Sequence, residues 1–85
     1  MQKIYFKLSS KEKLSVYKQT RKSFEMDLIQ RLCAVGIDPE DFNGKEFIPD
    51  EDKMSHFYIK ELLLKIEKVE EKILQFEIIV KSEEE

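Results

Sequence analysis

The 85-residue chain has the length of one small domain, and its composition excludes several classes of protein. Charged residues make up 39% and hydrophobic residues 41%, a blend that is typical of long helices and too apolar for a disordered chain. A single cysteine excludes an intramolecular disulfide, and no apolar run approaches the ~20 residues of a membrane-spanning helix. We therefore expect a cytoplasmic protein that does not associate with membranes.

The net charge of −3 conceals an uneven distribution along the chain. Residues 1–36 carry eight Lys or Arg and three Asp or Glu (+5), whereas residues 37–85 carry seven and fifteen (−8). This asymmetry has two interpretations. Either the basic part packs against the acidic part of the same molecule, or the basic part contacts nucleic acid.

The first nine residues predict a short strand or an extended lead-in to a helix. From Lys3 to Leu8 apolar and polar side chains alternate, which is the period-two pattern of a strand. Ser9 and Glu12 have the spacing of a capping box, in which each side chain satisfies a free backbone N–H of the other residue. We therefore expect a helix to begin at residue 10.

A first helix is predicted over residues 10–35, about 39 Å long at 1.5 Å per residue. Its apolar side chains recur at three- and four-residue steps. Gly36 suits the left-handed position that follows many helix ends, and Ile37 can then fold back towards Leu32. Apolar character lapses over residues 20–23, so a turn there is the alternative to one continuous helix.

Residues 36–49 are expected to form a connector. Residues 38–41 (Asp-Pro-Glu-Asp) predict one capped helical turn, because proline is preorganised for the first helical position. Asn43-Gly44 is a turn signal. The acidic residues 50–52 follow a proline and match the charge preferred at a helix N-terminus, so a second helix is predicted from residue 50 to residue 81.

The clearest pattern of the chain is a heptad repeat in this second helix, with apolar a and d positions over three heptads. We predict that this first apolar face is a partner or dimer interface. Six of its residues are Ile59, Leu62, Ile66, Val69, Ile73 and Phe76. Lysines at g and glutamates at e would attract in a parallel homodimer, as Lys65–Glu70 and Lys72–Glu77.

The same helix carries a second apolar face on its opposite side, where an ordinary surface helix is polar. This face consists of Phe57, Leu64, Leu74 and Ile78. A helix with two apolar faces must be buried twice, by the first helix and by a second subunit or partner. Residues 75–81 also alternate, so a strand is the alternative for that stretch, and residues 82–85 are expected to be a frayed tail.

The sequence contains no convincing set of residues for catalysis or metal binding. One histidine, His56, and one cysteine, Cys33, do not make up a zinc site or an assignable catalytic triad. We expect Cys33 to be a small buried hydrophobe. A calcium-loop alignment of the connector fails at its first ligand, where Pro39 stands. We therefore expect no enzymatic activity, no catalytic residue, no metal and no cofactor.

The opening of the chain resembles that of ribbon-helix-helix repressors, whose paired strands enter the DNA major groove. Residues 8–12 (Leu-Ser-Ser-Lys-Glu) resemble the strand-to-helix passage of that family, and residues 28–32 resemble part of its second helix. The Gly or Asn between the two helices of the family is missing, so residues 20–23 would have to make that turn. The nucleic-acid contacts that this resemblance implies are Lys3, Tyr5, Lys7, Lys11 and Arg21.

These patterns predict a mainly α fold, namely a helical hairpin with a long coiled-coil-like second helix and, as an open alternative for its start, a short N-terminal strand. The expected function is that of a non-catalytic protein–protein interaction module. Such a module would be a homodimer and an adaptor, regulator or inhibitor of a larger cytosolic protein. The alternative is a small dimeric DNA-binding regulator.

Overall fold

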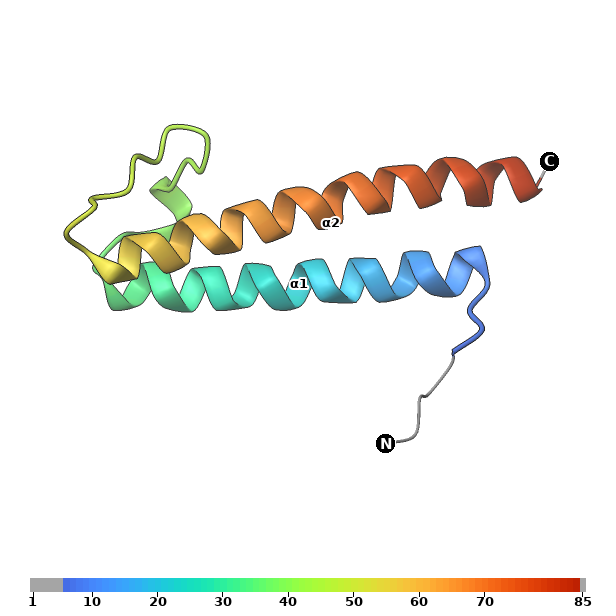
Figure 1. Ribbon diagram of the computed structural model, residues 1–85, viewed down its shortest axis with the longest axis horizontal. Coiled ribbons are helices and arrows are strands. Elements are labelled where there is room, and N and C mark those ends of the chain that lie inside the picture. The colour runs from blue at the N-terminus through green and yellow to red at the C-terminus, as the bar shows by residue number, and fades with distance from the viewer. Residues whose placement is uncertain (1–5, 85) are drawn as a thin grey trace.

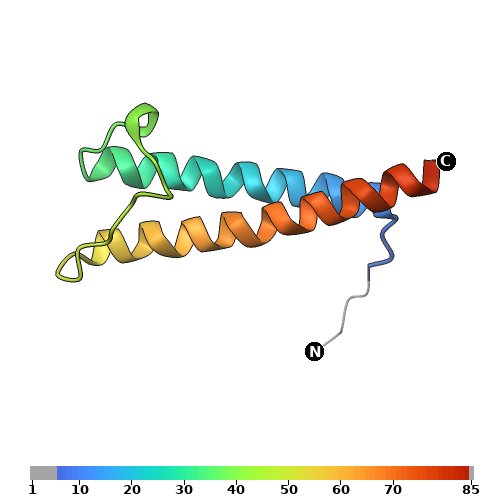
Figure 2. The same ribbon diagram turned by 90° about the horizontal axis from the view of Figure 1, so that it is seen from above.

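The computed structural model describes residues 6–84 and shows an antiparallel hairpin of two long helices (Figure 1). Helix α1 comprises Ser10–Ala34 and helix α2 comprises Met54–Glu84. The connector contains one short 3-10 helix, η1, at Pro39–Asp41. The predicted mainly α hairpin with a long second helix is confirmed. The start of α1 and the end of α2 lie at the same end of the molecule in both ribbon views (Figure 2).

Helix α1 begins at the predicted capping box. The Glu12 N–H donates to Ser9 Oγ at 3.1 Å, and the Ser9 N–H donates to Glu12 Oε1 at 3.2 Å. Both backbone donors would otherwise be left free at the helix start. Residues 6–9 form no strand, so the predicted strand is absent from its described part, and residues 3–5 lie outside the described residues.

We expect Ser9→Ala to lower the free energy of unfolding by about 1 kcal/mol, because the Glu12 N–H loses its acceptor. Urea denaturation followed by circular dichroism at 222 nm measures the difference. Ser15→Ala is the matched control, since Ser15 is an exposed position inside the same helix. Equal stability of the Ser9→Ala variant and the wild type would contradict the role of the cap.

Helix α1 ends at Ala34, one residue before the predicted end, and Gly36 has the left-handed conformation expected after the helix, with a φ of 80° that glycine adopts without strain. The Gly36 N–H donates to the Cys33 carbonyl at 3.1 Å, and the Ile37 N–H donates to the Leu32 carbonyl at 2.9 Å. This pair of hydrogen bonds is a Schellman motif, which satisfies the last carbonyls of the helix. The chain leaves the helix here and turns towards η1.

Residues 20–23 are helical and lie in the middle of α1. The Thr20 hydroxyl donates to the Val16 carbonyl one turn earlier at 2.9 Å, so this polar side chain is satisfied within the helix. The alternative of a turn at this position is therefore wrong. The turn that a ribbon-helix-helix arrangement requires does not form.

The connector contains the two turns that the sequence predicts. The Glu40 N–H donates to the Asp38 carboxylate at 3.0 Å and caps η1, and the Glu46 N–H donates to the Asn43 carbonyl at 3.2 Å. The connector then packs on α2 at Gly44, where a Cβ atom would lie 2.9 Å from Leu63 Cδ2. A side chain at position 44 would therefore require the Leu63 side chain of α2 to shift.

The predicted start of the second helix at residue 50 is wrong by four residues. The Asp50 carboxylate accepts a hydrogen bond from the Asp52 N–H at 3.1 Å, and the Asp50 carbonyl accepts one from the Lys53 N–H at 3.0 Å. Aspartate side chains compete with the helix for backbone donors in this way. Residues 50–53 therefore form a turn, and α2 begins at Met54.

The second helix continues through residues 75–81 as predicted, but its predicted end at residue 81 is wrong by three residues, because α2 ends at Glu84. No strand forms over residues 75–81. The Ser10 hydroxyl donates to the Glu83 carboxylate at 2.9 Å, and Lys11 Nζ lies 2.9 Å from Glu84 Oε1. The start of α1 thus supplies a neutral hydrogen-bond donor and a positive charge for acidic residues that are unfavourable at a helix C-terminus.

The helices pack against each other along their length, and the buried core of the described residues is small. Its buried side chains are Leu32, Ile59, Leu62 and Ile73. Near the open end of the hairpin the rings of Tyr17 and Phe76 stack, with centroids 5.6 Å apart. The molecule is a single layer of helices, only 18 Å thick along its shortest axis.

Candidate functional site

The first apolar face of α2 packs on α1 within the chain. Ile59, Leu62 and Ile73 are buried, whereas Ile66, Val69 and Phe76 are half-buried. The heptad pattern therefore marks a helix–helix interface, and the helix that packs against α2 there is α1 of the same molecule. In the hairpin α1 covers this face. The expectation that the face is a partner or dimer interface is therefore corrected.

Three cation–π contacts cover one edge of this internal interface. Arg31 lies over the Tyr58 ring at 4.9 Å from its centroid, and Lys65 Nζ lies over Phe24 at 5.9 Å. Lys13 Nζ lies 5.7 Å from the centroid of Phe76. Lys65, which the predicted parallel dimer pairs with Glu70 of another copy, is therefore engaged with α1.

The second apolar face is exposed. Its four residues are Phe57, Leu64, Leu74 and Ile78, which expose between 48% and 71% of their surface. Charged side chains, all exposed, separate Leu64 from Leu74 on α2. Large apolar side chains that recur on one helix in this way are typical of interaction surfaces. This face is the strongest candidate for a functional site in the described residues.

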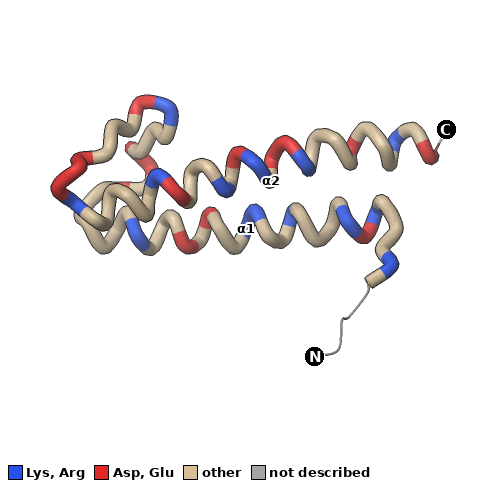
Figure 3. Tube along the Cα trace, viewed as in Figure 1, with Lys and Arg blue, Asp and Glu red and all other residues tan. Residues whose placement is uncertain are grey.

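Opposite charges lie side by side along the hairpin (Figure 3). Between the helices, Lys11 Nζ lies 2.9 Å from Glu84 Oε1 and Lys18 Nζ lies 3.9 Å from Glu77 Oε1. All four side chains are largely exposed, so each pair contributes little to stability. They nevertheless show the basic helix packed beside the acidic one, which is the first interpretation of the charge asymmetry.

The residues predicted to contact nucleic acid do not form one surface in the described part of the chain. Lys11 pairs with Glu84, and Arg21 Nε donates to Glu25 Oε1 at 2.9 Å. This hydrogen bond and the Glu25 charge raise the pKa of the Arg21 guanidinium, with smaller contributions from acidic residues of α2. Lys7 is exposed ahead of α1, while Lys3 and Tyr5 lie outside the described residues. Carboxylates of the same molecule thus compensate the positive charges of two predicted nucleic-acid contacts, Lys11 and Arg21.

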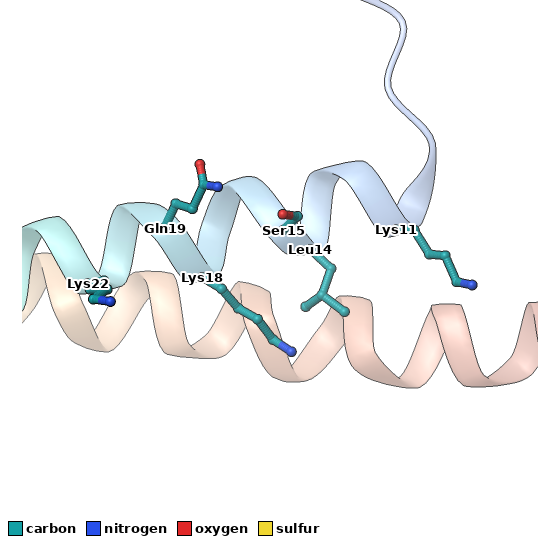
Figure 4. A pocket seen from close by; sticks show the side chains of 6 residues that line it. All are labelled: Lys11, Leu14, Ser15, Lys18, Gln19 and Lys22. Carbon is teal, nitrogen blue, oxygen red and sulfur yellow. The ribbon is translucent and has the colours of Figure 1, made fainter.

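A shallow, open hollow runs beside the first half of α1 (Figure 4). It is lined by Lys11, Leu14, Ser15, Lys18, Gln19 and Lys22. Leu14 and Lys18 point towards α2, whereas Gln19 points away from it. The polar groups therefore do not converge on one position, as the groups of a small-molecule site do.

His56 has a structural role at the start of α2. Its Nδ1 accepts a hydrogen bond from the Asp50 N–H at 3.1 Å, and its ring centroid lies 5.4 Å from that of Phe47. Phe47 in turn lies 5.5 Å from Phe42, so the three rings hold the connector against the helix start. No sequence pattern predicts this cluster, because Phe42, Phe47 and His56 are too irregularly spaced to form one.

Cys33 is exposed, which contradicts its predicted burial. It follows the buried Leu32 on α1, and one residue turns a helix by about 100°, so the Cys33 side chain points away from α2. Within residues 6–84, no group of three or more His, Cys, Asp or Glu side chains is arranged to hold a metal ion.

None of the helices in the described part of the chain is both long and apolar enough to cross a membrane. Comparison of the chain with protein-family models, curated proteins and solved structures gives no match. The assignment of a function therefore rests on the geometry of the hairpin itself.

Proposed function

We propose that this protein is a non-catalytic protein–protein interaction module, which acts as an adaptor, regulator or inhibitor of a larger protein. The second apolar face of α2 is its binding surface. The observation that carries the proposal is that α2 has two apolar faces, of which α1 covers one and leaves Phe57, Leu64, Leu74 and Ile78 exposed.

The energetics of apolar burial support this assignment. Covering one such side chain contributes roughly 1.5–3 kcal/mol, so a partner that covers several of them gains enough to offset the cost of association. A long helix that presents apolar residues along one side suits the helix-in-groove mode of recognition. Packing on α1 also holds α2 in a helical conformation, so little conformational entropy is lost on binding.

The DNA-binding alternative has weaker support. It depends on a turn at residues 20–23, which lie inside α1, and on positive charges that are compensated at Lys11 and Arg21. Its diagnostic result would be binding of random duplex DNA that weakens steeply between 50 and 200 mM salt.

The proposal is tested with the double variant Leu64→Asp/Ile78→Asp. We expect it to lose the proteins that the wild-type hairpin retains in affinity purification. Binding of each purified candidate partner, measured by calorimetry, should weaken at least about 100-fold, because two apolar anchors are replaced by carboxylates that cannot be buried.

The matched control is Ile48→Asp, which places the same charge on a connector residue that is 85% exposed. Circular dichroism must show unchanged helix content for each variant. Retention of the same partners with unchanged affinity by the double variant would overturn the proposal. Salt-sensitive binding of random duplex DNA with no protein partner would favour the alternative.

A further inference from the structure

We infer that His56 is a pH-sensitive latch, which holds residues 42–50 of the connector against the start of α2 only while its ring is neutral. The latch involves none of the four residues of the second apolar face, so it stands apart from the proposed function. Three observations carry it: how few contacts fix the connector, which ring nitrogen accepts the hydrogen bond, and where the ring lies on the helix.

Few contacts fix this part of the connector to α2. Its own hydrogen bonds are local and join residues two or three positions apart. Within the described chain, the one hydrogen bond that joins it to α2 runs from the Asp50 N–H to His56 Nδ1, at 3.1 Å. The other contacts are apolar: the Phe47 ring lies 5.4 Å from the His56 ring, and the backbone at Gly44 packs on Leu63. His56 therefore supplies both a hydrogen bond and a ring contact.

The hydrogen bond requires the neutral ring. A backbone N–H can only donate, so His56 Nδ1 accepts with its lone pair and the ring proton is on Nε2. When the ring is protonated, both nitrogens are donors, and the Asp50 N–H and the Nδ1–H would face each other across 3.1 Å. The contact with Phe47 forms with either ring, so the hydrogen bond is the part that responds to pH.

The position of the ring on α2 adds to this effect. His56 is the third residue of the helix, and a positive charge is unfavourable in the first turn. The first turn of α2 contains no acidic residue that would compensate such a charge. A protonated ring is therefore opposed twice, by the Asp50 N–H and by the helix itself.

The elements that meet at His56 carry charges of both signs. They are residues 50–52 (Asp-Glu-Asp) in the turn, Glu46 beside Phe47, Lys53 and Lys60 on the α2 side, and Arg31 of α1, which lies over Tyr58. No ion pair involves His56 among the described residues. The carboxylates of residues 50–52 attract a charged ring, but this attraction does not make Nδ1 an acceptor again.

Opening of the latch uncovers apolar surface on α2. The closed connector binds no proton at His56 Nδ1, whereas the open one can bind it, so a falling pH favours the open form. Histidine ordinarily changes its charge between about pH 5 and 8. Over that range the connector releases Leu63, which is half-buried beneath Gly44. The two helices stay together, because their buried core does not include the latch.

The test is NMR spectroscopy of the isotope-labelled full chain between about pH 8 and pH 5, with circular dichroism at each pH. At the higher pH we expect a nuclear Overhauser effect between Gly44 and the Leu63 methyl groups. It should disappear as the His56 ring signals report protonation. The protection factor of the Asp50 amide against hydrogen exchange should fall about threefold to tenfold, the effect of losing one hydrogen bond. Helix content should stay unchanged.

Two variants separate the hydrogen bond from the ring. His56→Asn keeps an acceptor, because the Asn Oδ1 stands roughly where Nδ1 does, but it cannot become charged. Its Gly44–Leu63 contact and its Asp50 protection should therefore be the same at both pH values. His56→Phe keeps an aromatic ring but has no acceptor, so the Asp50 protection should already be lost at the higher pH.

Three results would overturn the inference. In the first, the Gly44–Leu63 contact and the Asp50 protection persist after His56 is protonated. In the second, His56→Asn responds to pH as the wild type does, which assigns the response to the neighbouring carboxylates. In the third, helix content is lost over the same pH range, which assigns the response to the whole hairpin and not to the connector.

Discussion

Replacement of Ile59 by alanine is expected to lower the free energy of unfolding by about 3 kcal/mol. Ile59 is 0% exposed and lies in the second turn of α2. Removing its side chain loses the transfer free energy of three carbon atoms and leaves a cavity, and such substitutions cost roughly 2–5 kcal/mol. Single domains are stable by about 5–15 kcal/mol, so this one change would remove a large part of the total.

The measurement is urea denaturation of the wild type and the variant at equal protein concentration, followed by circular dichroism. Ile48→Ala removes the same atoms from a side chain that is 85% exposed, so it should change stability by less than about 0.5 kcal/mol. Equal effects of the two substitutions would contradict the core described here. Unchanged m-values would show that the comparison is one of stability alone.

The second large effect is expected for Phe76→Ala, which should lower the free energy of unfolding by about 2–3 kcal/mol. The Phe76 ring stacks on Tyr17 with an interplanar angle of 25°, and Lys13 Nζ lies 5.7 Å from its centroid. Phenylalanine-to-alanine changes in full cores cost about 3–5 kcal/mol, and Phe76 is only half-buried. Its loss would separate the two helices near their open end.

A double-mutant cycle with Tyr17→Ala isolates the contribution of the stacked pair. The coupling free energy between Tyr17 and Phe76 should be about 0.5–1.5 kcal/mol, because an aromatic pair gains this much beyond its buried area. Phe6→Ala is the control, since Phe6 is 78% exposed and should show neither effect. A coupling free energy near zero would show that the two rings do not stabilise each other in solution.

The features that the sequence alone determined are local. The capping box of Ser9 and Glu12, the left-handed Gly36 and the capped turn at Asp38 each depend on residues within a few positions of one another. Hydrogen bonds of this kind form in any context that leaves the segment free to adopt them. The helical periodicity of the apolar residues was equally clear, and it predicted the mainly α hairpin.

The ends of α2 depended on groups that are distant in the sequence. Glu83 and Glu84 are helical where a frayed tail was predicted, because the antiparallel arrangement brings Ser10 and Lys11 beside them. At the other end, the predicted helix start gave way to a turn whose Asp50 N–H donates to His56. Local sequence propensity cannot predict these helix ends, because the groups that stabilise them come together only in the folded chain.

The tertiary structure alone decided which apolar face of α2 is buried. Periodicity shows that Ile59 and Ile73 share one side and that Leu64 and Ile78 lie on another, and both faces are apolar enough to be covered. The heptad face, whose apolar residues recur every three to four positions, packs on α1, whereas the other face is interrupted by exposed charges. The sequence thus determined that α2 has two faces to bury. Only the position of α1 decided that the face around Leu64 is the one left exposed.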